Sequence, residues 1–388
     1  MAGIPGKMRS QVTLFIITRI VINTAYRATY PFLRVIAAGL GVTLPVISLA
    51  LTIRSLAGGL GPFLAPVADR FGRKTGMLLG LSIFSLGTGF VAIWPTLPAF
   101  FAAIILAHVG NMIFLPAMQA YLGDQIAYQR RGTVLALTEL SWSLSFIIMV
   151  PLAGLLIARL GWWGPFPFLA GLGLLMTALV AWRIPGDVIL EHRRRGSLWS
   201  SLGQVVRHPA AWLALSFYLL INCANELVNL VFGVWLNDSF GLQIAALGLA
   251  AVVIGAAELG GEAATATLTD RVGKKRAVRA GLLITSLAAI SLPLIGTSLP
   301  GALVGLFLFY LGFEFTLVSY IPLLTEVLPD ARATIMAAGL AVSSLGRALG
   351  ALVGPWLYAG GFEQNALISL LLNGLALLVL ARLRIGDE

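Results

Sequence analysis

Long apolar segments alternate with short polar ones along this chain of 388 residues. A helix needs roughly 20 apolar residues to cross a bilayer. Twelve segments reach that length, near residues 12–36, 43–68, 75–94, 97–122, 132–158, 165–183, 209–237, 242–268, 276–296, 299–327, 333–359 and 365–382. The pattern predicts an all-α membrane protein with twelve transmembrane helices.

The longest polar stretch separates the sixth segment from the seventh and predicts three parts of the chain. These are a six-helix bundle at 1–184, a cytoplasmic linker at 185–208 and a second six-helix bundle at 209–388. The linker contains the run Arg193-Arg194-Arg195. We interpret this run as a solvated segment that touches anionic lipid.

The charge composition supports the membrane class. Only 11% of the residues are charged and 59% are hydrophobic, whereas a soluble domain carries about 25% charged residues. The net charge of +10 comes from short basic clusters between apolar segments, which is the pattern of juxtamembrane loops and excludes a nucleic-acid-binding stripe. Most of these clusters lie at the two ends and after even-numbered segments. We therefore expect both termini to be cytoplasmic, in the cytoplasmic membrane of a bacterial cell.

A short charged motif occurs twice, which indicates that the chain is built from two similar halves. Asp69-Arg70-Phe71-Gly72-Arg73-Lys74 recurs as Asp270-Arg271-Val272-Gly273-Lys274-Lys275, at an offset of 270 − 69 = 201 residues. A second set of charges flanks the loops after the fourth and tenth segments: Asp124, Arg131, Glu326 and Arg332. The same charged turn thus stands at the same membrane boundary in each half, an arrangement that favours a transporter over an enzyme.

Charges inside the apolar segments are unevenly distributed. The third, sixth, ninth and twelfth segments carry charge only at or near their ends. Lipid-facing helices exclude charge, whereas helices around a wet interior tolerate it. We therefore expect four outer helices and eight around a cavity. The charged residues inside those eight are Arg19, Arg27, Arg54, Glu139, Glu226, Glu258, Glu262, Glu314 and Arg347.

These features resemble the major facilitator superfamily over essentially the whole chain. The resemblance implies two pseudo-symmetric bundles and a charge relay that closes the cytoplasmic side. Asp69, Arg73, Asp124 and Arg131 would form that latch, although the same charges could instead only set topology. The family pattern begins with Gly where this chain has Ala65 and Ala266. The remaining motif positions of this expected cytoplasmic gate are Arg70, Gly72, Lys74, Asp270, Arg271, Gly273, Lys274, Glu326 and Arg332.

The first and seventh segments carry a second internal repeat. Ile22-Asn23-Thr24-Ala25-Tyr26-Arg27 aligns with Ile221-Asn222-Cys223-Ala224-Asn225-Glu226, at an offset of 226 − 27 = 199. In the superfamily these two helices line the central cavity. Three interpretations of Arg27 and Glu226 stay open. The two residues bind a polar substrate, Glu226 carries a proton, or the two form a structural pair. Asn23, Tyr26 and Asn222 would add hydrogen bonds.

The other intramembrane charges have separate interpretations. Arg19 and Glu139 lie at the same depth of one half and are expected to pair. For Glu314 and Arg347, a structural pair and a coupling role both stay open. Arg54 has no acidic partner at its depth in its half, which favours contact with substrate. Glu258 lies one turn from Glu262 and repels it if both are ionised.

Two helices carry glycine patterns of interest. Gly346, Gly350 and Gly354 on the eleventh helix are expected to serve close helix packing. Pro151 and Gly154 on the fifth match the Gly-Pro signature of the family's antiporters only in part.

Together these patterns predict a secondary transporter that works by rocker-switch alternating access, with proton-coupled efflux as in the drug/metabolite:proton antiporter branch. A proton-coupled importer of a polar metabolite and a lipid or lysolipid flippase on the same fold remain alternatives. We expect no enzyme activity, because no nucleophile motif is present, and no ATP-driven transport, because no Walker A motif is present. The expected partners of this monomer are a small-molecule substrate and the lipid bilayer, with no nucleic acid. We expect no cofactor and no metal, and a proton as coupling ion.

Overall fold

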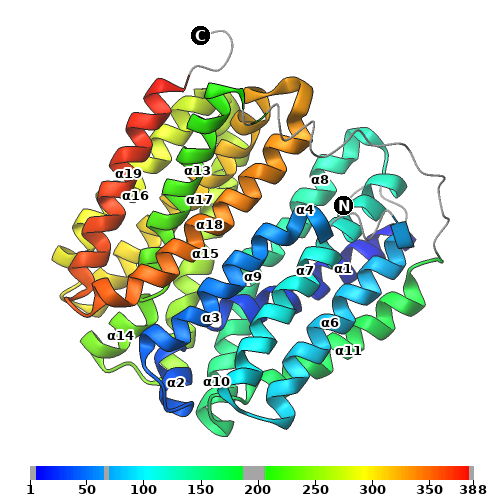
Figure 1. Ribbon diagram of the computed structural model, residues 1–388, viewed down its shortest axis with the longest axis horizontal. Helices are drawn as coiled ribbons and strands as arrows, with labels where there is room; N and C mark the ends of the chain where they lie inside the picture. Colours follow the sequence, from blue (N-terminus) through cyan, green and yellow to red (C-terminus); the bar gives the residue numbers. More distant parts are fainter. Residues whose placement is uncertain (1–5, 65–69, 187–204, 206, 384–388) are drawn as a thin grey trace. The chain divides into compact units, whose positions relative to one another are not determined.

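A computed structural model describes residues 6–64, 70–186, 205 and 207–383, and these residues form helices without any strand (Figure 1). The chain divides into two compact units. Unit 1 comprises residues 1–43, 60–191 and 244–255; unit 2 comprises residues 44–59, 192–243 and 256–388. Most of the linker expected at 185–208 lies outside the described residues, so its boundaries stay a prediction.

The described helices confirm the membrane class. Ten of them are long and apolar enough to cross a membrane, or eleven if the bent pair Leu33–Gly39 and Leu44–Leu60 is one span. α1 (Gly6–Arg27) accounts for the remaining expected segment as a helix of 22 residues. Its arginines and its asparagine make α1 more polar than the other spans.

Unit 1 is built around α1 and a tightly packed pair of helices. α6 (Arg73–Ile93) packs against both α7 (Leu97–Gln125) and α11 (Pro165–Arg183). A Cβ atom at Gly80 of α6 would lie 2.5 Å from the carbonyl oxygen of Gly110 in α7, so neither position has room for a side chain. The shorter helices of unit 1 are α2 (Leu33–Gly39), α4 (Gly61–Leu64), α8 (Tyr128–Glu139), α9 (Ser141–Leu144) and α10 (Val150–Leu160).

Unit 2 repeats this packing. Its spans are α13 (Pro209–Asn229), α15 (Ile244–Val272, from residue 256), α16 (Lys274–Ile295), α17 (Leu299–Val327), α18 (Arg332–Tyr358) and α19 (Phe362–Arg382), with α3 (Leu44–Ala57) and α14 (Phe232–Phe240). A Cβ atom at Gly281 of α16 would lie 2.9 Å from the carbonyl oxygen of Gly312 in α17. These positions follow Gly80 and Gly110 by 281 − 80 = 201 and 312 − 110 = 202 residues. The internal repeat therefore includes a close glycine contact between two helices in each half.

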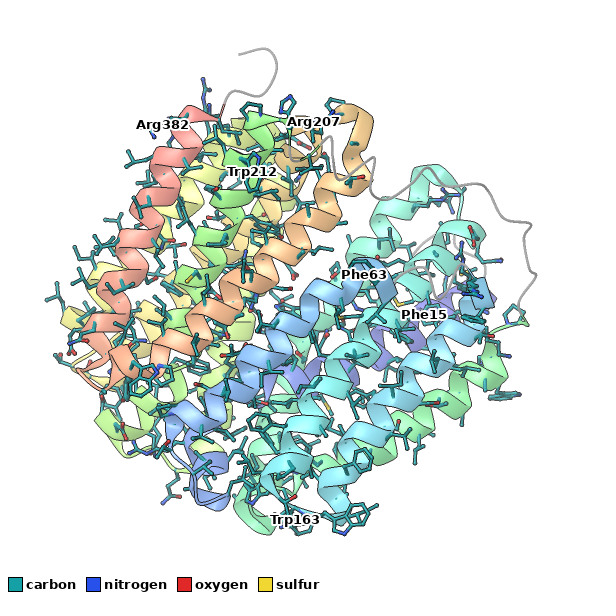
Figure 2. All side chains as sticks on the ribbon, viewed as in Figure 1. Phe15, Phe63, Trp163, Arg207, Trp212 and Arg382 are labelled. Carbon is teal, nitrogen blue, oxygen red and sulfur yellow. The ribbon has the colours of Figure 1, made fainter. Side chains whose placement is uncertain are left out.

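The helices expected to face lipid expose large apolar side chains. α6, α11, α16 and α19 correspond to the third, sixth, ninth and twelfth predicted segments, and the exposed fractions of Leu86, Leu174, Leu287 and Leu378 are 63%, 62%, 66% and 59%. Figure 2 shows Trp212, Arg207 and Arg382 at the same end of unit 2. Tryptophan and basic residues at the end of a span are typical of a membrane–water interface.

Four predicted segments are interrupted, which the apolar pattern did not show. The first segment ends as a helix at Arg27 and resumes at Leu33 after a turn around Pro31. The second changes to 3₁₀ geometry at Gly58–Leu60. The fifth contains the π-helical turn η2 (Ser145–Met149), and the seventh breaks between Asn229 and Phe232. Hydropathy is insensitive to such breaks because the side chains remain apolar through them.

Candidate functional site

Glu226 is the most deeply buried charged group of unit 2. It lies in α13, its exposed fraction is 0%, and one of its carboxylate oxygens is 3.6 Å from the Arg347 guanidinium of α18. Asn229 donates an amide hydrogen bond to the same carboxylate at 3.4 Å, and the hydroxyl of Tyr310 donates to Asn229 at 2.8 Å. The carboxylate thus has a cationic and a neutral partner, and a third residue orients the neutral one.

The glycines of α18 explain how Arg347 reaches Glu226. A Cβ atom at Gly350 would lie 2.7 Å from the Glu226 Cβ, and one at Gly346 would lie 2.5 Å from the carbonyl oxygen of Leu219. A Cβ at Gly354 would lie 2.9 Å from Leu230. The packing role predicted for this glycine row is therefore confirmed: it brings α18 against the face of α13 that carries Glu226.

Asn365 is a residue that the sequence reasoning missed. It lies in α19, is fully buried, and donates hydrogen bonds of 3.0 Å to the carbonyl oxygens of Leu227 in α13 and Gly354 in α18. It therefore links the two helices that carry the ion pair, next to Glu226. The sequence signal that could have pointed to Asn365 was an amide side chain within the apolar twelfth predicted segment.

Three further side chains extend the polar face of α13. Tyr218, Asn222 and Asn225 are all buried, at helical spacings of three and four residues that place them on one side of the helix. The Asn222 amide donates to the carbonyl of Tyr218 at 2.8 Å. The Asn222 Oδ1 and Asn225 Nδ2 atoms make no hydrogen bond within the part of the chain that the structure describes. Such atoms are suited to bind a polar group of a substrate.

Arg27 of unit 1 occupies an aromatic environment. Its guanidinium carbon lies 3.6 Å from the ring centre of Phe146 and 4.3 Å from that of Trp142. It also donates to the carbonyl of Trp142 at 3.3 Å. The negative faces of the two rings partly offset the loss of water around this cation.

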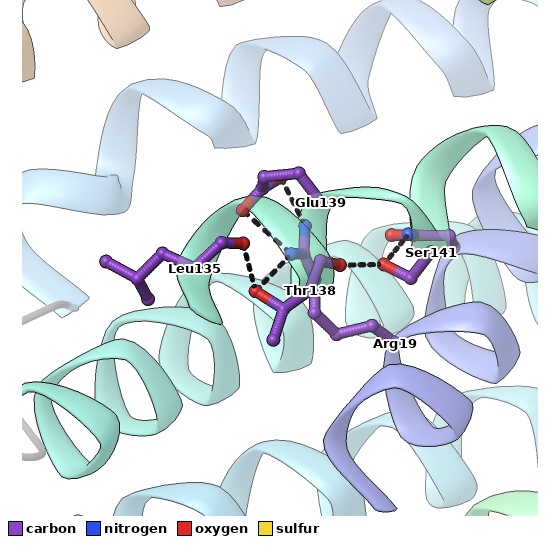
Figure 3. A network of polar contacts seen from close by, with 6 residues as sticks. Arg19, Leu135, Thr138, Glu139 and Ser141 are labelled. Carbon is purple, nitrogen blue, oxygen red and sulfur yellow. Dashed lines mark hydrogen bonds and ion pairs between the residues drawn. The ribbon is translucent and has the colours of Figure 1, made fainter. Parts of the chain in front are cut away.

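Arg19 and Glu139 form the pair that was predicted (Figure 3). The two guanidinium nitrogens NH1 and NH2 each donate to one carboxylate oxygen at 2.8 Å, which is a bidentate arrangement. NH1 also lies 3.3 Å from the Thr138 hydroxyl. Four residues further along α1, Asn23 donates to the Ser141 hydroxyl at 3.4 Å. Asn23 therefore contacts the fifth predicted segment, which comprises α8, α9, η2 and α10 and is called helix five below.

The rings around Tyr26 form a cluster in unit 1. The ring centre of Tyr26 lies 5.7 Å from Tyr30, 6.0 Å from His108 and 5.6 Å from Trp142. The hydroxyl of Tyr30 donates to that of Tyr26 at 3.2 Å. Tyr26, His108 and Trp142 each keep part of their surface exposed.

Each charged turn holds an ion pair, and the two pairs stand at equivalent positions. Arg73 Nε is 3.3 Å from Asp124 Oδ2 in unit 1, and Lys274 Nζ contacts Glu326 Oε1 in unit 2. The turn glycines Gly72 and Gly273 have φ values of 102° and 94°, which only glycine adopts without strain. This requirement explains why glycine occurs in both copies of the motif.

Other members of the expected latch have different positions. Arg131 Nε donates to the carbonyl of Ile126 at the end of α7, at 2.9 Å. Asp69 lies outside the described residues. The side chains of Arg70, Asp270, Arg271 and Arg332 are exposed.

A family model described as Major Facilitator Superfamily matches residues 15–351 and 227–388 of this chain. The chain belongs to the major facilitator superfamily. It is 27% identical over 351 residues to the uncharacterized MFS-type transporter YwfA of Bacillus subtilis (strain 168), covering 87% of this chain and 83% of YwfA. It is 25% identical over 369 residues to Multidrug resistance protein 2 of the same organism, covering 88% and 89% of the two chains.

The fold comparison agrees with this membership. The crystal structure of a bacterial homolog to the human lysosomal transporter Spinster, in an inward-facing and unoccupied conformation, superposes with a TM-score of 0.75 at 16% identity, covering 97% of each chain. The predicted family and fold are confirmed. The protein is an MFS transporter and not an enzyme.

The remaining candidate residues of this MFS transporter lie in unit 2. Arg54 belongs to α3, which packs against α18, and its exposed fraction is 1%. The sequence reasoning placed Arg54 in the first half, whereas α3 belongs to the same compact unit as Glu226.

Glu258 and Glu314 are also buried, and Tyr218 lies within electrostatic range of both Glu314 and Arg347. Binding and coupling roles for these residues stay predictions. Within the described residues, no group of three or more His, Cys, Asp and Glu side chains could hold a metal ion.

Proposed function

We propose that this MFS transporter is a proton-coupled exporter of small lipophilic molecules, with Glu226 as the group that takes up and releases the proton. The observation that carries the proposal is the fully buried Glu226 carboxylate with Arg347 at 3.6 Å. An ionisable group at this depth costs on the order of 2.5–3.5 kcal/mol even on the lower scales, so such residues mark substrate or ion pathways by default.

The contacts of Glu226 give the coupling a physical basis. Protonation neutralises the carboxylate and removes its attraction to Arg347, while the amide of Asn229 is able to hydrogen-bond either form through its oxygen or its nitrogen. A proton therefore changes the contact between α13 and α18. A substrate bound by Asn222 and Asn225 lies on the same polar face of α13 and would sense that change.

The two charged turns support alternating access. Arg73–Asp124 and Lys274–Glu326 are partly exposed pairs at equivalent ends of the two halves. Surface pairs of this kind contribute only about 0.2–1 kcal/mol each. They therefore suit a latch that opens and closes in every transport cycle. The name of Multidrug resistance protein 2 favours efflux as the direction.

The test is transport in proteoliposomes with ethidium as the probe and an imposed pH gradient. The wild type should accumulate ethidium against its gradient in exchange for protons, and Glu226→Gln should lose at least tenfold of this gradient-driven uptake. Exchange of labelled for unlabelled ethidium without a pH gradient should persist in Glu226→Gln, because exchange needs no proton. The exposed Glu363→Gln serves as the matched control and should behave as wild type. Undiminished gradient-driven uptake in Glu226→Gln would refute the role of Glu226, and movement of substrate and proton in the same direction would replace export by import.

A further inference from the structure

Helix five of unit 1 departs from regular α geometry on both sides of Trp142. α8 ends at Glu139, and the π-helical turn Ser145–Met149 begins three residues after Trp142. Pro151 follows two residues after this turn, and in a regular helix its ring would clash with the carbonyl of Ile147. The wider π turn relieves that clash. Turns of this kind occur frequently at functional sites.

Three residues of α1 hold this irregular segment. Arg19, Asn23 and Arg27 are spaced by four residues and share one face of α1. They contact successive turns of helix five: Glu139 with Thr138, then Ser141, then Trp142 with Phe146. Figure 3 shows the first of these contacts, where Arg19 meets Thr138 and Glu139 next to Ser141. All three α1 residues are buried, with exposed fractions of 4%, 3% and 2%.

The element that these contacts position is the indole of Trp142. Arg27 lies 4.3 Å from its ring centre and donates to its backbone carbonyl, and the Ser145 hydroxyl donates to the same carbonyl at 2.6 Å. The Tyr26 ring packs at 5.6 Å. Trp142 is nevertheless partly exposed, as are Tyr26 and His108 beside it. A positioned indole on a residue that keeps part of its surface exposed, next to two further rings, offers a surface for stacking.

We propose that Trp142 is a substrate contact that selects planar aromatic molecules, and that Arg19, Asn23 and Arg27 are positioning residues that act through it. The inference rests on the transport function proposed above and names its substrate class. It also changes the interpretation of Asn23 and Arg27, since their described contacts direct them to helix five.

The test measures binding of two matched probes to the purified full chain in detergent by equilibrium dialysis. Naphthalene-2-carboxamide is planar and aromatic, and decahydronaphthalene-2-carboxamide has the same carbon skeleton without aromatic rings. The wild type should bind the aromatic probe at least tenfold more tightly. Trp142→Leu should abolish this preference, while Trp142→Phe should keep most of it. Trp163→Leu removes another partly exposed tryptophan of unit 1 and should leave the preference unchanged.

The positioning role has its own measurement. Arg19→Met should lower the ratio of the two dissociation constants severalfold, and Arg19→Lys, which keeps a cation beside Glu139, should restore part of it. A merely structural role of Arg19 would lower thermal stability and leave that ratio unchanged.

Two results would overturn the proposal: a wild type that does not prefer the aromatic probe, or a Trp142→Leu variant that still prefers it as the wild type does. The Glu226→Gln protein separates this inference from the proposed coupling. If it keeps the aromatic preference while proton-driven transport proves absent in the wild type, only the coupling fails. If transport is proton-driven and the preference is absent, only the role of Trp142 fails.

Discussion

Arg27 and Glu226 occupy equivalent positions of α1 and α13, yet the two halves stabilise their buried charges by different means. Arg27 packs on the rings of Phe146 and Trp142, and Glu226 meets the guanidinium of Arg347. Phe146 and Arg347 are themselves equivalent, at an offset of 347 − 146 = 201 residues. The same pair of positions thus holds a cation on a ring in one half and an anion beside a cation in the other.

This comparison shows that the repeat preserves contact geometry while the chemistry diverges. In unit 1 the ring partner is permanent, because a π face does not titrate. In unit 2 the partner is a charge, so the contact depends on the ionisation of Glu226. The second arrangement can respond to a proton, and the first leaves aromatic surface for a substrate.

Removing the cation of unit 2 should have the largest effect. Arg347→Met leaves the fully buried Glu226 without its guanidinium, and breaking a buried pair by removing one partner costs about 3–5 kcal/mol. Thermal denaturation in detergent should show this loss. The double variant with Glu226→Met should recover most of it, and a double variant as unstable as the single one would contradict the pairing.

The glycine contact behind Glu226 should come next. Gly350→Ala places a Cβ 2.7 Å from the Glu226 Cβ, and overpacking of this kind costs about 1–3 kcal/mol. Gly374→Ala is the matched control in α19, because a Cβ there meets nothing within 4 Å. The control should gain up to about 1 kcal/mol from its higher helix propensity. Equal melting temperatures for the two variants would show that α13 and α18 are not in close contact.

Removing the cation of unit 1 should cost less. Arg27→Met keeps the packing against Phe146 and Trp142 and loses the cation–π attraction, which contributes about 0.5–2 kcal/mol. Melting temperatures of Arg27→Met and Arg347→Met, measured together, test the comparison directly. A larger loss of stability for Arg27→Met than for Arg347→Met would contradict the conclusion that the buried charge of unit 2 depends more strongly on its partner.

The smallest effect is expected at the charged turns. Arg73→Ala removes a partly exposed pair with Asp124 and should change stability by about 0.2–1 kcal/mol. The difference should shrink in high salt because exposed charges are screened. Lys274→Ala in unit 2 is the equivalent variant and should behave alike. A loss of several kcal/mol in either would show that the turn is a structural core element.

Much of the architecture followed from the sequence because it depends on length and on the cost of charge in lipid. Segment length predicted the spans, and the assignment of α6, α11, α16 and α19 as outer helices from their lack of interior charge stays a prediction. The pair of Arg19 and Glu139 was predictable because depth along each helix places both side chains at one level. Helix breaks were not predictable, since apolar side chains continue through them.

The sequence by itself determined that this is a two-fold repeated membrane protein and where its charged turns lie, because hydropathy and periodicity act along one dimension. Only the tertiary structure decided that Glu226 meets Arg347, that Arg27 rests on Phe146 and Trp142, and that Asn365 joins α13 to α18. Those contacts depend on the rotation of each helix about its axis and on the close approach allowed by Gly350, and a linear pattern does not specify which face of one helix meets another.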